Sequence, residues 1–260
     1  MELPQFTAAD VRRWAAFSGD WNPIHFDRRA ANAVGAEEPF AHGMFVMLPL
    51  KQSTTNLIKD RPRLAEWIQL DYRFRLPTPL GRRLEFVWAG QASNSRRAEL
   101  KGIDNGVEYI LASMTEADRI PTAPAELCVH TMTCPISPDD WAFPYDAGWI
   151  AAEAIAFRQA MKFYLPGGMI GDVSSAFDEY ISAGVGKPLL MHARHTSYIS
   201  NEVLDKDIMF FDMMEIKHCL RRTRSDASGS QFSLDITISH DGRELLKSTL
   251  GLFVRQSGGG

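Results

Sequence analysis

The spacing of hydrophobic residues along the chain changes twice from a helical period to an alternating one. Apolar positions at helical spacing, and apolar runs of helical length, predict five helices over about residues 7–18, 27–34, 43–58, 150–165 and 172–184. The third is apolar on nearly all sides, as expected of a helix enclosed by other structure. Pro49 lies inside it, and an internal proline costs about 3 kcal/mol or bends the axis, so we expect a bent or short helix.

Alternation of apolar and polar residues predicts strands after the third helix and again near the end of the chain. These strands cover about residues 68–74, 84–88, 98–100, 107–111, 208–221, 231–239 and 246–254. Asp104-Asn-Gly106 and His240-Asp-Gly242 are turn sequences between neighbouring strands. The two turns end 136 residues apart (242 − 106 = 136), about half of the 260-residue chain. Each half therefore has helices first and antiparallel strands after, an α+β plan that we interpret as an internal duplication.

The alternation lapses between about residues 118 and 140, where four prolines interrupt the sequence. We therefore expect a first domain over residues 1–119, a linker over 120–140 and a second domain over 141–257. A chain of 260 residues is long enough for one large domain or two small ones, each with its own core.

Composition narrows the class of protein. The chain is 45% hydrophobic and 23% charged, with a formal net charge of -4 and no basic run, so no nucleic-acid partner is expected. The longest apolar run, residues 44–50, is too short to span a bilayer, and the N-terminus lacks the parts of a signal peptide. Three cysteines without metal-binding spacing fit a reducing compartment. We therefore expect a cytoplasmic protein with no membrane partner.

The candidate chemistry lies in the stretch Phe17-Ser-Gly-Asp-Trp-Asn-Pro-Ile-His-Phe-Asp27. Asp20 stands five residues before His25, and the Asn22-Pro23 pair between them cannot continue a helix. We therefore expect a shaped loop that turns the carboxylate and the imidazole toward one point. Taken singly, Asp20 could be a turn or cap residue and His25 a structural histidine. Together around a shared water they suffice as an acid–base pair for adding or removing water.

Three segments resemble the signature of the MaoC-like dehydratases, the group that includes the (R)-specific enoyl-CoA hydratases. They are the loop at 17–27, Ala41-His-Gly-Met44 and Arg73-Phe-Arg-Leu-Pro-Thr-Pro-Leu-Gly81, and the likeness covers roughly the first 117 residues. The resemblance implies a double hot-dog fold, in which two antiparallel sheets, each wrapped around a central helix, pack as a pseudo-dimer. The second half lacks the motif, so it would be a degenerate repeat. The assembly implied is a homodimer or this intramolecular pseudo-dimer.

The resemblance also implies a reaction, the interconversion of trans-2-enoyl and (R)-3-hydroxyacyl thioesters carried by coenzyme A or an acyl carrier protein. Asp20 would take a proton from water, and His25 would orient the water and relay a proton. The N–H of Gly43, at the start of the central helix, would stabilise the thioester oxygen. Asn22 would fix the loop, and His42 would either line the site or cap the central helix. No metal or organic cofactor is needed.

Two other functions stay open. Asp178 and Glu179 on the predicted helix 172–184 could direct water at a thioester carbonyl, as a helix carboxylate does in hot-dog thioesterases, or could simply form a solvated helix face. Such a thioesterase or acyl-transfer enzyme would work from the second half. The chain could also bind acyl thioesters without turning them over. His192 and His195 have no third ligand near them in the sequence, so we predict no metal site.

Overall fold

The computed structural model describes residues 1–59, 65–92, 95–121, 130–136, 141, 143–164, 189–226 and 229–255. The helices in these ranges are α1 (Ala8–Ser18), α2 (Arg28–Ala33), α3 (Gly43–Ile58) and α4 (Gly148–Tyr164), with short 3-10 helices at Pro23–His25, Asn201–Val203 and Ile208–Phe211. The strands are β1 (Trp67–Phe74), β2 (Leu84–Ala92), β3 (Ser95–Gly102), β4 (Glu108–Ala117), β5 (His130–Cys134), β6 (Leu189–Ser200), β7 (Met214–Asp226), β8 (Gly229–His240) and β9 (Arg243–Arg255). The predicted helix over 172–184, with Asp178 and Glu179, lies outside the described residues.

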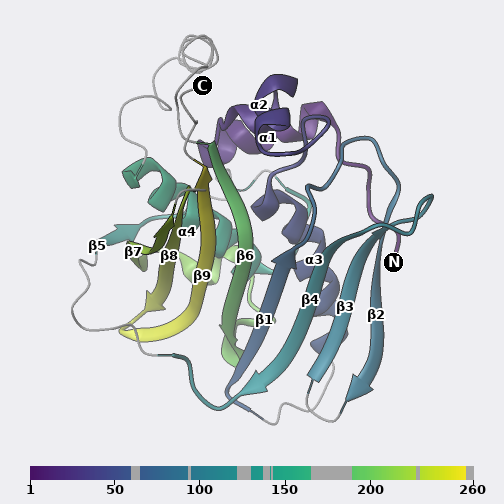
Figure 1. The fold of residues 1–260 in the computed structure, drawn as a ribbon. Helices are drawn as coiled ribbons and strands as arrows, with labels where there is room; N and C mark the ends of the chain where they lie inside the picture. The colour runs from purple at the N-terminus through teal and green to yellow at the C-terminus, as the bar shows by residue number, and fades with distance from the viewer. Residues whose placement is uncertain are drawn as a thin grey trace.

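The strands form one antiparallel nine-stranded sheet in the order β2-β3-β4-β1-β6-β9-β8-β7-β5 (Figure 1). The order repeats on either side of the β1–β6 pair, with β4 and β9 next, then β3 and β8, then β2 and β7. The internal duplication is therefore visible in the strand order. Helix α3 covers one half of the sheet and α4 the other (Figure 1). This arrangement confirms the predicted α+β double hot-dog fold.

The two halves meet edge to edge at β1 and β6. The pairing runs from Trp67 opposite Ser200 to Arg73 opposite Arg194, so the sheet is continuous across the junction. Asp71 on β1 accepts hydrogen bonds from Arg194 (2.7 Å) and from Thr196 (2.9 Å) on β6. Burial would raise the pKa of Asp71, but these bonds hold it below its usual range. Backbone pairing and charged side chains thus join the halves at the same place.

Helices α3 and α4 join the halves a second time. The indole N–H of Trp149 at the start of α4 donates to Thr55 Oγ1 on α3 over 3.1 Å. Gln52 Oε1 on α3 accepts from the backbone N–H groups of Asp146 (3.1 Å) and Ala147 (3.3 Å), just before α4 begins. These side chains fix the first turn of one central helix against the last turns of the other.

A buried polar cluster lies between these helices and the sheet; its members are Lys51, Glu153, His195, Ser197 and Ser248. Lys51 on α3 forms an ion pair with Glu153 on α4, and their side chains are 0% and 1% exposed. Glu153 Oε1 also accepts from Ser197 Oγ over 2.6 Å, and from Ser248. Nε2 of His195 lies 3.0 Å from the same oxygen. Burial alone would raise the pKa of Glu153, but Lys51 and His195 hold it below its usual range.

Most predicted elements are confirmed, with two corrections. Helix α3 runs for 16 residues through Pro49, so it is not short. The core buries α3 on most sides, and this burial offsets the missing backbone bond at Pro49. The predicted strand over 208–221 is wrong at its start, because residues 208–211 form a 3-10 helix capped by Asp207 and β7 begins only at Met214.

Two strands have no counterpart among the predicted elements. In β6 the inward-facing residues include His195 and Ser197, which belong to the buried polar cluster, so no apolar alternation marks it. Strand β5 lies within the segment expected to be a linker and pairs with β7. At the matching place in the first half, Glu2 bridges to Glu85 on β2. No helix among the described residues is both long and apolar enough to cross a lipid bilayer.

Candidate active site

The loop that carries Asp20 is fixed by the end of α1. The helix ends at Gly19, whose φ of 76° lies in the left-handed region that glycine adopts without strain. The backbone N–H of Asp20 then donates to Ser18 Oγ over 3.1 Å. The carboxylate Oδ1 of Asp20 accepts from the backbone N–H of Asn22 over 3.3 Å. These contacts hold the carboxylate from within the loop.

The Asn22-Pro23 pair starts a 3-10 turn over Pro23–His25. The side chain of Asn22 caps this turn by accepting from the backbone N–H of Ile24 at 3.5 Å. Pro23 stands at the first position of the turn, where a missing N–H leaves no bond unmade. The turn buries the side chain of His25 and places it beside Asp20. Asn22 thus lies where a loop-fixing residue is expected, and it is not part of the cavity wall.

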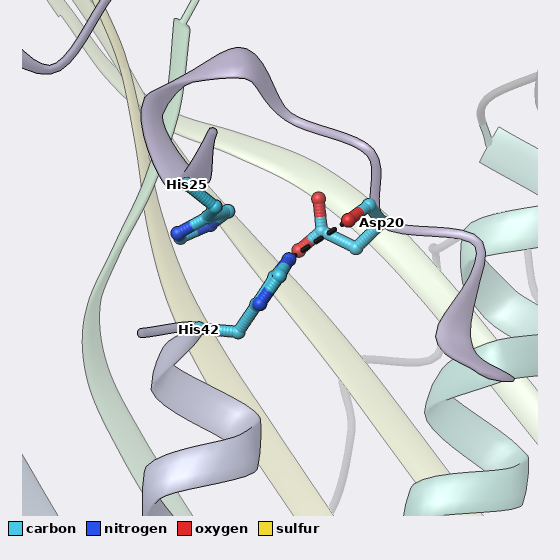
Figure 2. Close-up of side chains that lie close together, drawn as sticks. All are labelled: Asp20, His25 and His42. Atoms are coloured by element: carbon cyan, nitrogen blue, oxygen red, sulfur yellow. Dashed lines mark hydrogen bonds between the residues drawn. The ribbon is translucent and has the colours of Figure 1, made fainter. Parts of the chain in front are cut away.

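His25, His42 and Asp20 gather at the start of α3, with the carboxylate beside the two imidazole rings (Figure 2). Nδ1 of His25 donates to the carbonyl oxygen of Phe40 over 2.8 Å. Nε2 of His42 donates to the carbonyl oxygen of Asp20 over 2.8 Å. A carbonyl only accepts, so these bonds assign the proton of each neutral ring. The lone pair of His25 is therefore on Nε2 and that of His42 on Nδ1.

Electrostatics keep both rings neutral. Burial lowers the pKa of His25 to about 3, with His42 acting in the same direction and Asp20 opposing it. Burial also lowers the pKa of His42 to about 3. Burial raises the pKa of Asp20, while His25 and the Asn22 N–H pull it down. The site thus pairs a neutral imidazole with a carboxylate of increased proton affinity, which suits proton transfer near neutral pH.

Asp20, His25 and His42 each offer a possible metal-ligand atom, and these atoms lie within 4.8 Å of one another. The two imidazole rings are nearly stacked, with centroids 3.7 Å apart and planes inclined by 31°. The hydrogen bonds to the carbonyl oxygens of Phe40 and Asp20 occupy one nitrogen of each ring, so each histidine has one ring nitrogen left that could bind a metal ion.

A cavity of about 450 Å³ opens beside this cluster. Its wall includes Asp20, His25 and Gly43 from the first half of the chain. Gly43 begins α3, and the His42 side chain makes no capping bond to this helix end, so the Gly43 N–H has no partner within the helix. Most of the remaining wall is apolar and comes from both halves, including Met44, Phe157, Met161, Met191, Leu250 and Phe253. A polar end and an apolar body suit an acyl thioester.

The structure thus brings Asp20, His25 and Gly43 to one cavity, and it leaves Asn22 and His42 just outside the cavity wall. His42 occupies the N-cap position of α3, but its ring binds the backbone of Asp20 instead of capping the helix. The cavity also contains His192. In the sequence, His192 stands out only as half of a possible metal pair with His195, because no alternating pattern predicts β6.

We expect the free energy of unfolding to fall as pH is lowered from 7 to 5. His25 and His42 have pKa values of about 3 in the folded chain against an ordinary 6.5, so the unfolded chain binds more protons below pH 6.5. Each histidine contributes stability that is fully present above its ordinary pKa and declines by about 1.4 kcal/mol per pH unit below it.

Urea denaturation at pH 7, 6 and 5 measures this slope in the wild type and in His42→Gln. The glutamine keeps a donor for the Asp20 carbonyl but does not titrate, so the slope should be clearly shallower. The raised pKa of Asp20 acts with the opposite sign in both chains, so the difference between the slopes is the test. Equal slopes would contradict the assignment of His42 as buried and neutral.

Known proteins resemble this chain in sequence and in fold. Residues 4–108 match the family model of the MaoC-like domain. Over 82 residues the chain is 33% identical to the mitochondrial 3-hydroxyacyl-[acyl-carrier-protein] dehydratase of Arabidopsis thaliana, a match that covers 31% of this chain and 46% of that protein. The chain thus matches about half the length of this curated relative.

Two solved structures are similar over most of the chain. The dehydratase domain of RzxB from Pseudomonas fluorescens has a TM-score of 0.50 and 11% identity, covering 84% of this chain and 86% of that one. A structure described as a MaoC-like dehydratase has a TM-score of 0.48 and 14% identity, covering 99% of this chain and 97% of that one. At such identities a structural likeness bears on the fold alone.

Proposed function

We propose that this chain, whose residues 4–108 match the family model of the MaoC-like domain, interconverts trans-2-enoyl and (R)-3-hydroxyacyl thioesters. Relatives of this domain support an acyl-thioester hydratase or dehydratase at the level of the family. One observation supports this specific reaction: Asp20, His25 and the Gly43 N–H lie at one cavity, and the rest of that cavity is mostly apolar. Coenzyme A or an acyl carrier protein would carry the acyl group.

In the hydration direction, a water bound between Asp20 and His25 attacks C3 of the enoyl group. The carboxylate of Asp20 and the Nε2 lone pair of His25 can each accept one hydrogen bond from this water. As the O–C3 bond forms, the electrons of the C2=C3 bond move toward the thioester carbonyl. The Gly43 N–H stabilises the resulting enolate oxygen, helped by the positive end of the α3 dipole.

Proton transfer completes the addition. Asp20 takes the proton that the water loses and then gives it up to C2 of the enolate, directly or through Nε2 of His25, so both hydrogens of the water end in the product and Asp20 is again ionised. His25 has its ring proton on Nδ1, bonded to Phe40. It can therefore relay a proton to C2 only after Nε2 has accepted one. Dehydration follows the same steps in reverse, with removal of the C2 proton first.

The thioesterase alternative needs a helix carboxylate that faces substrate. The carboxylate that α4 places in the described part of the second half is Glu153, which is 1% exposed, is paired with Lys51 and does not line the cavity. Asp178 and Glu179 lie outside the described residues. No observation here favours hydrolysis over hydration.

The test is to mix the protein with crotonyl-CoA and follow both the ultraviolet band of the conjugated enoyl thioester and the release of free thiol. We expect the band to decay without thiol release, and (R)-3-hydroxybutyryl-CoA to accumulate. Thiol release in step with decay would instead indicate a thioesterase. No change with crotonyl-CoA or with a crotonyl-acyl carrier protein would leave only a binding role and would overturn the proposal.

We expect kcat/KM to fall on the acid side, by about tenfold per pH unit below the pKa of Asp20. Burial raises that pKa above its ordinary 3.8, and the base must be ionised to accept a proton. His25 adds no limb between pH 5 and 8, because its pKa is about 3. Initial rates with crotonyl-CoA from pH 4.5 to 8 measure the profile. An acid limb that persists in the residual activity of Asp20→Asn would show that the limb does not belong to Asp20.

A further inference from the structure

The second half of the chain supplies one polar side chain to the cavity. The described wall residues from α4, β6 and β9 are otherwise apolar or small, namely Phe157, Met161, Met191, Ala193, Leu250, Leu252 and Phe253. The exception is His192, which belongs to β6. The reaction proposed above does not use this residue. Burying the polar ring of a histidine in a wall that is otherwise apolar costs free energy unless the ring is hydrogen-bonded.

His192 lies directly against the start of α3. A Cβ placed on Gly43 would come within 2.7 Å of Nδ1 of His192 and 3.1 Å of its Cβ. Phe74 on β1 closes the other side, with its ring centroid 4.8 Å from that of His192. Glycine at position 43 is therefore needed for this close approach. The imidazole of His192 thus sits at the same end of the cavity as the Gly43 N–H.

One nitrogen of the His192 ring is buried without a hydrogen-bond partner. This atom is Nε2, for which the described residues provide no donor or acceptor. Leaving a buried polar atom unpaired is destabilising. The ring therefore has hydrogen-bonding capacity that the described protein does not use.

His192 is neutral in the folded chain. Burial, His195 and Lys51 all lower the pKa of His192 well below its ordinary value. A neutral imidazole carries a proton on one nitrogen and a lone pair on the other, so the ring can donate one hydrogen bond and accept one.

We propose that the His192 ring forms a hydrogen bond with an N–H or O–H group of the bound acyl thioester, beside Gly43. The site would then be composite, with Asp20 and His25 from the first half and His192 from the second. The inference rests on the proposed function for the identity of the ligand. Two donors of a 3-hydroxyacyl thioester fit the chemistry: the amide N–H of its pantetheine arm and the 3-hydroxyl group.

The experiment compares His192→Phe, which fills the space but cannot accept a hydrogen bond, with His192→Gln, whose side-chain oxygen can. We expect His192→Phe to lower kcat/KM for crotonyl-CoA hydration by about tenfold, as for the loss of one hydrogen bond, mostly through KM. His192→Gln should recover most of the loss. The thermal midpoint of His192→Phe should not fall. A lower midpoint with unchanged KM would show a structural role and overturn the inference.

Binding to the Asp20→Asn variant identifies the donor and separates this inference from the reaction. Calorimetry would give the dissociation constants of crotonyl-CoA and (R)-3-hydroxybutyryl-CoA with and without His192→Phe. Weaker binding of both ligands assigns the pantetheine amide, and weaker binding of the hydroxy ligand alone assigns the 3-hydroxyl. Unchanged binding of both overturns the inference while leaving the proposed function intact. If the wild type binds these ligands without turning them over, the proposed reaction fails but the binding role of His192 is still decided.

Discussion

Asp20→Asn will lower kcat/KM for enoyl-thioester hydration by about 10³-fold, the middle of the range for removing a general base. Asparagine has nearly the same shape, and its side-chain oxygen can still accept from the Asn22 N–H that now binds Asp20 Oδ1 at 3.3 Å. The loop and the substrate affinity should therefore persist while the proton acceptor is lost. Initial rates and a binding isotherm on the same preparation measure both.

Asp27→Asn is the matched control, because it removes a carboxylate from the same stretch of chain. Asp27 caps α2 by accepting from the Ala30 N–H over 2.8 Å, and asparagine caps a helix equally well. Asp27 does not line the cavity, so activity should stay near that of the wild type. A loss in Asp27→Asn as large as that in Asp20→Asn would show that the loop tolerates no substitution, and would remove the case for Asp20 as the base.

The double variant Asp20→Asn, His25→Asn tests whether the two residues act on one water. Groups that act as a unit give non-additive losses, so the double variant should be little slower than the worse single variant. Losses that multiply would show that Asp20 and His25 serve separate steps.

The second large effect is on stability. Lys51→Met or Glu153→Gln alone will lower the free energy of unfolding by about 3–5 kcal/mol, because either change leaves one charge of the ion pair buried without its partner. The pair lies between α3 and α4, so the docking of the two halves should weaken with it. Urea unfolding of each variant measures the loss.

The double variant Lys51→Met, Glu153→Gln separates the pair from its surroundings. It removes both charges, and the glutamine oxygen can still accept from Ser197. We expect its loss in the free energy of unfolding to be smaller than the sum of the two single losses by at least about 2 kcal/mol. Additive losses, or single losses below about 1 kcal/mol, would mean that the charges of Lys51 and Glu153 are not coupled as their contact indicates.

The loop that carries Asp20 and His25 could be predicted because most of its geometry is local. Gly19, Asn22 and Pro23 fix the turn within a few residues of Asp20 and His25, and each acts through its own backbone preference or a short-range bond. The α+β class followed from the strand alternation and the two hairpin turns, which are also local signals, whereas the double hot-dog fold was implied by the resemblance to the MaoC-like dehydratases.

The opposite wall of the cavity could not be predicted, because it depends on contacts between distant segments. Strand β6 lacks apolar alternation since His195 and Ser197 point inward to Glu153, which lies on α4 more than 40 positions earlier in the chain. No pattern near His192 indicates that its ring meets Gly43. The role of His42 depends in the same way on Asp20, 22 residues before it, so a helix cap was an equally reasonable interpretation.

The pairing of β1 with β6 also bears on how the protein behaves at high dilution. Two separate hot-dog subunits that shared such a seam would come apart as their concentration fell below the dissociation constant. Here both partners belong to one chain, so each sees the other at an effective concentration of order millimolar, whatever the number of molecules in solution. A cavity walled by both halves should therefore stay assembled at nanomolar protein, and specific activity should not decline on dilution.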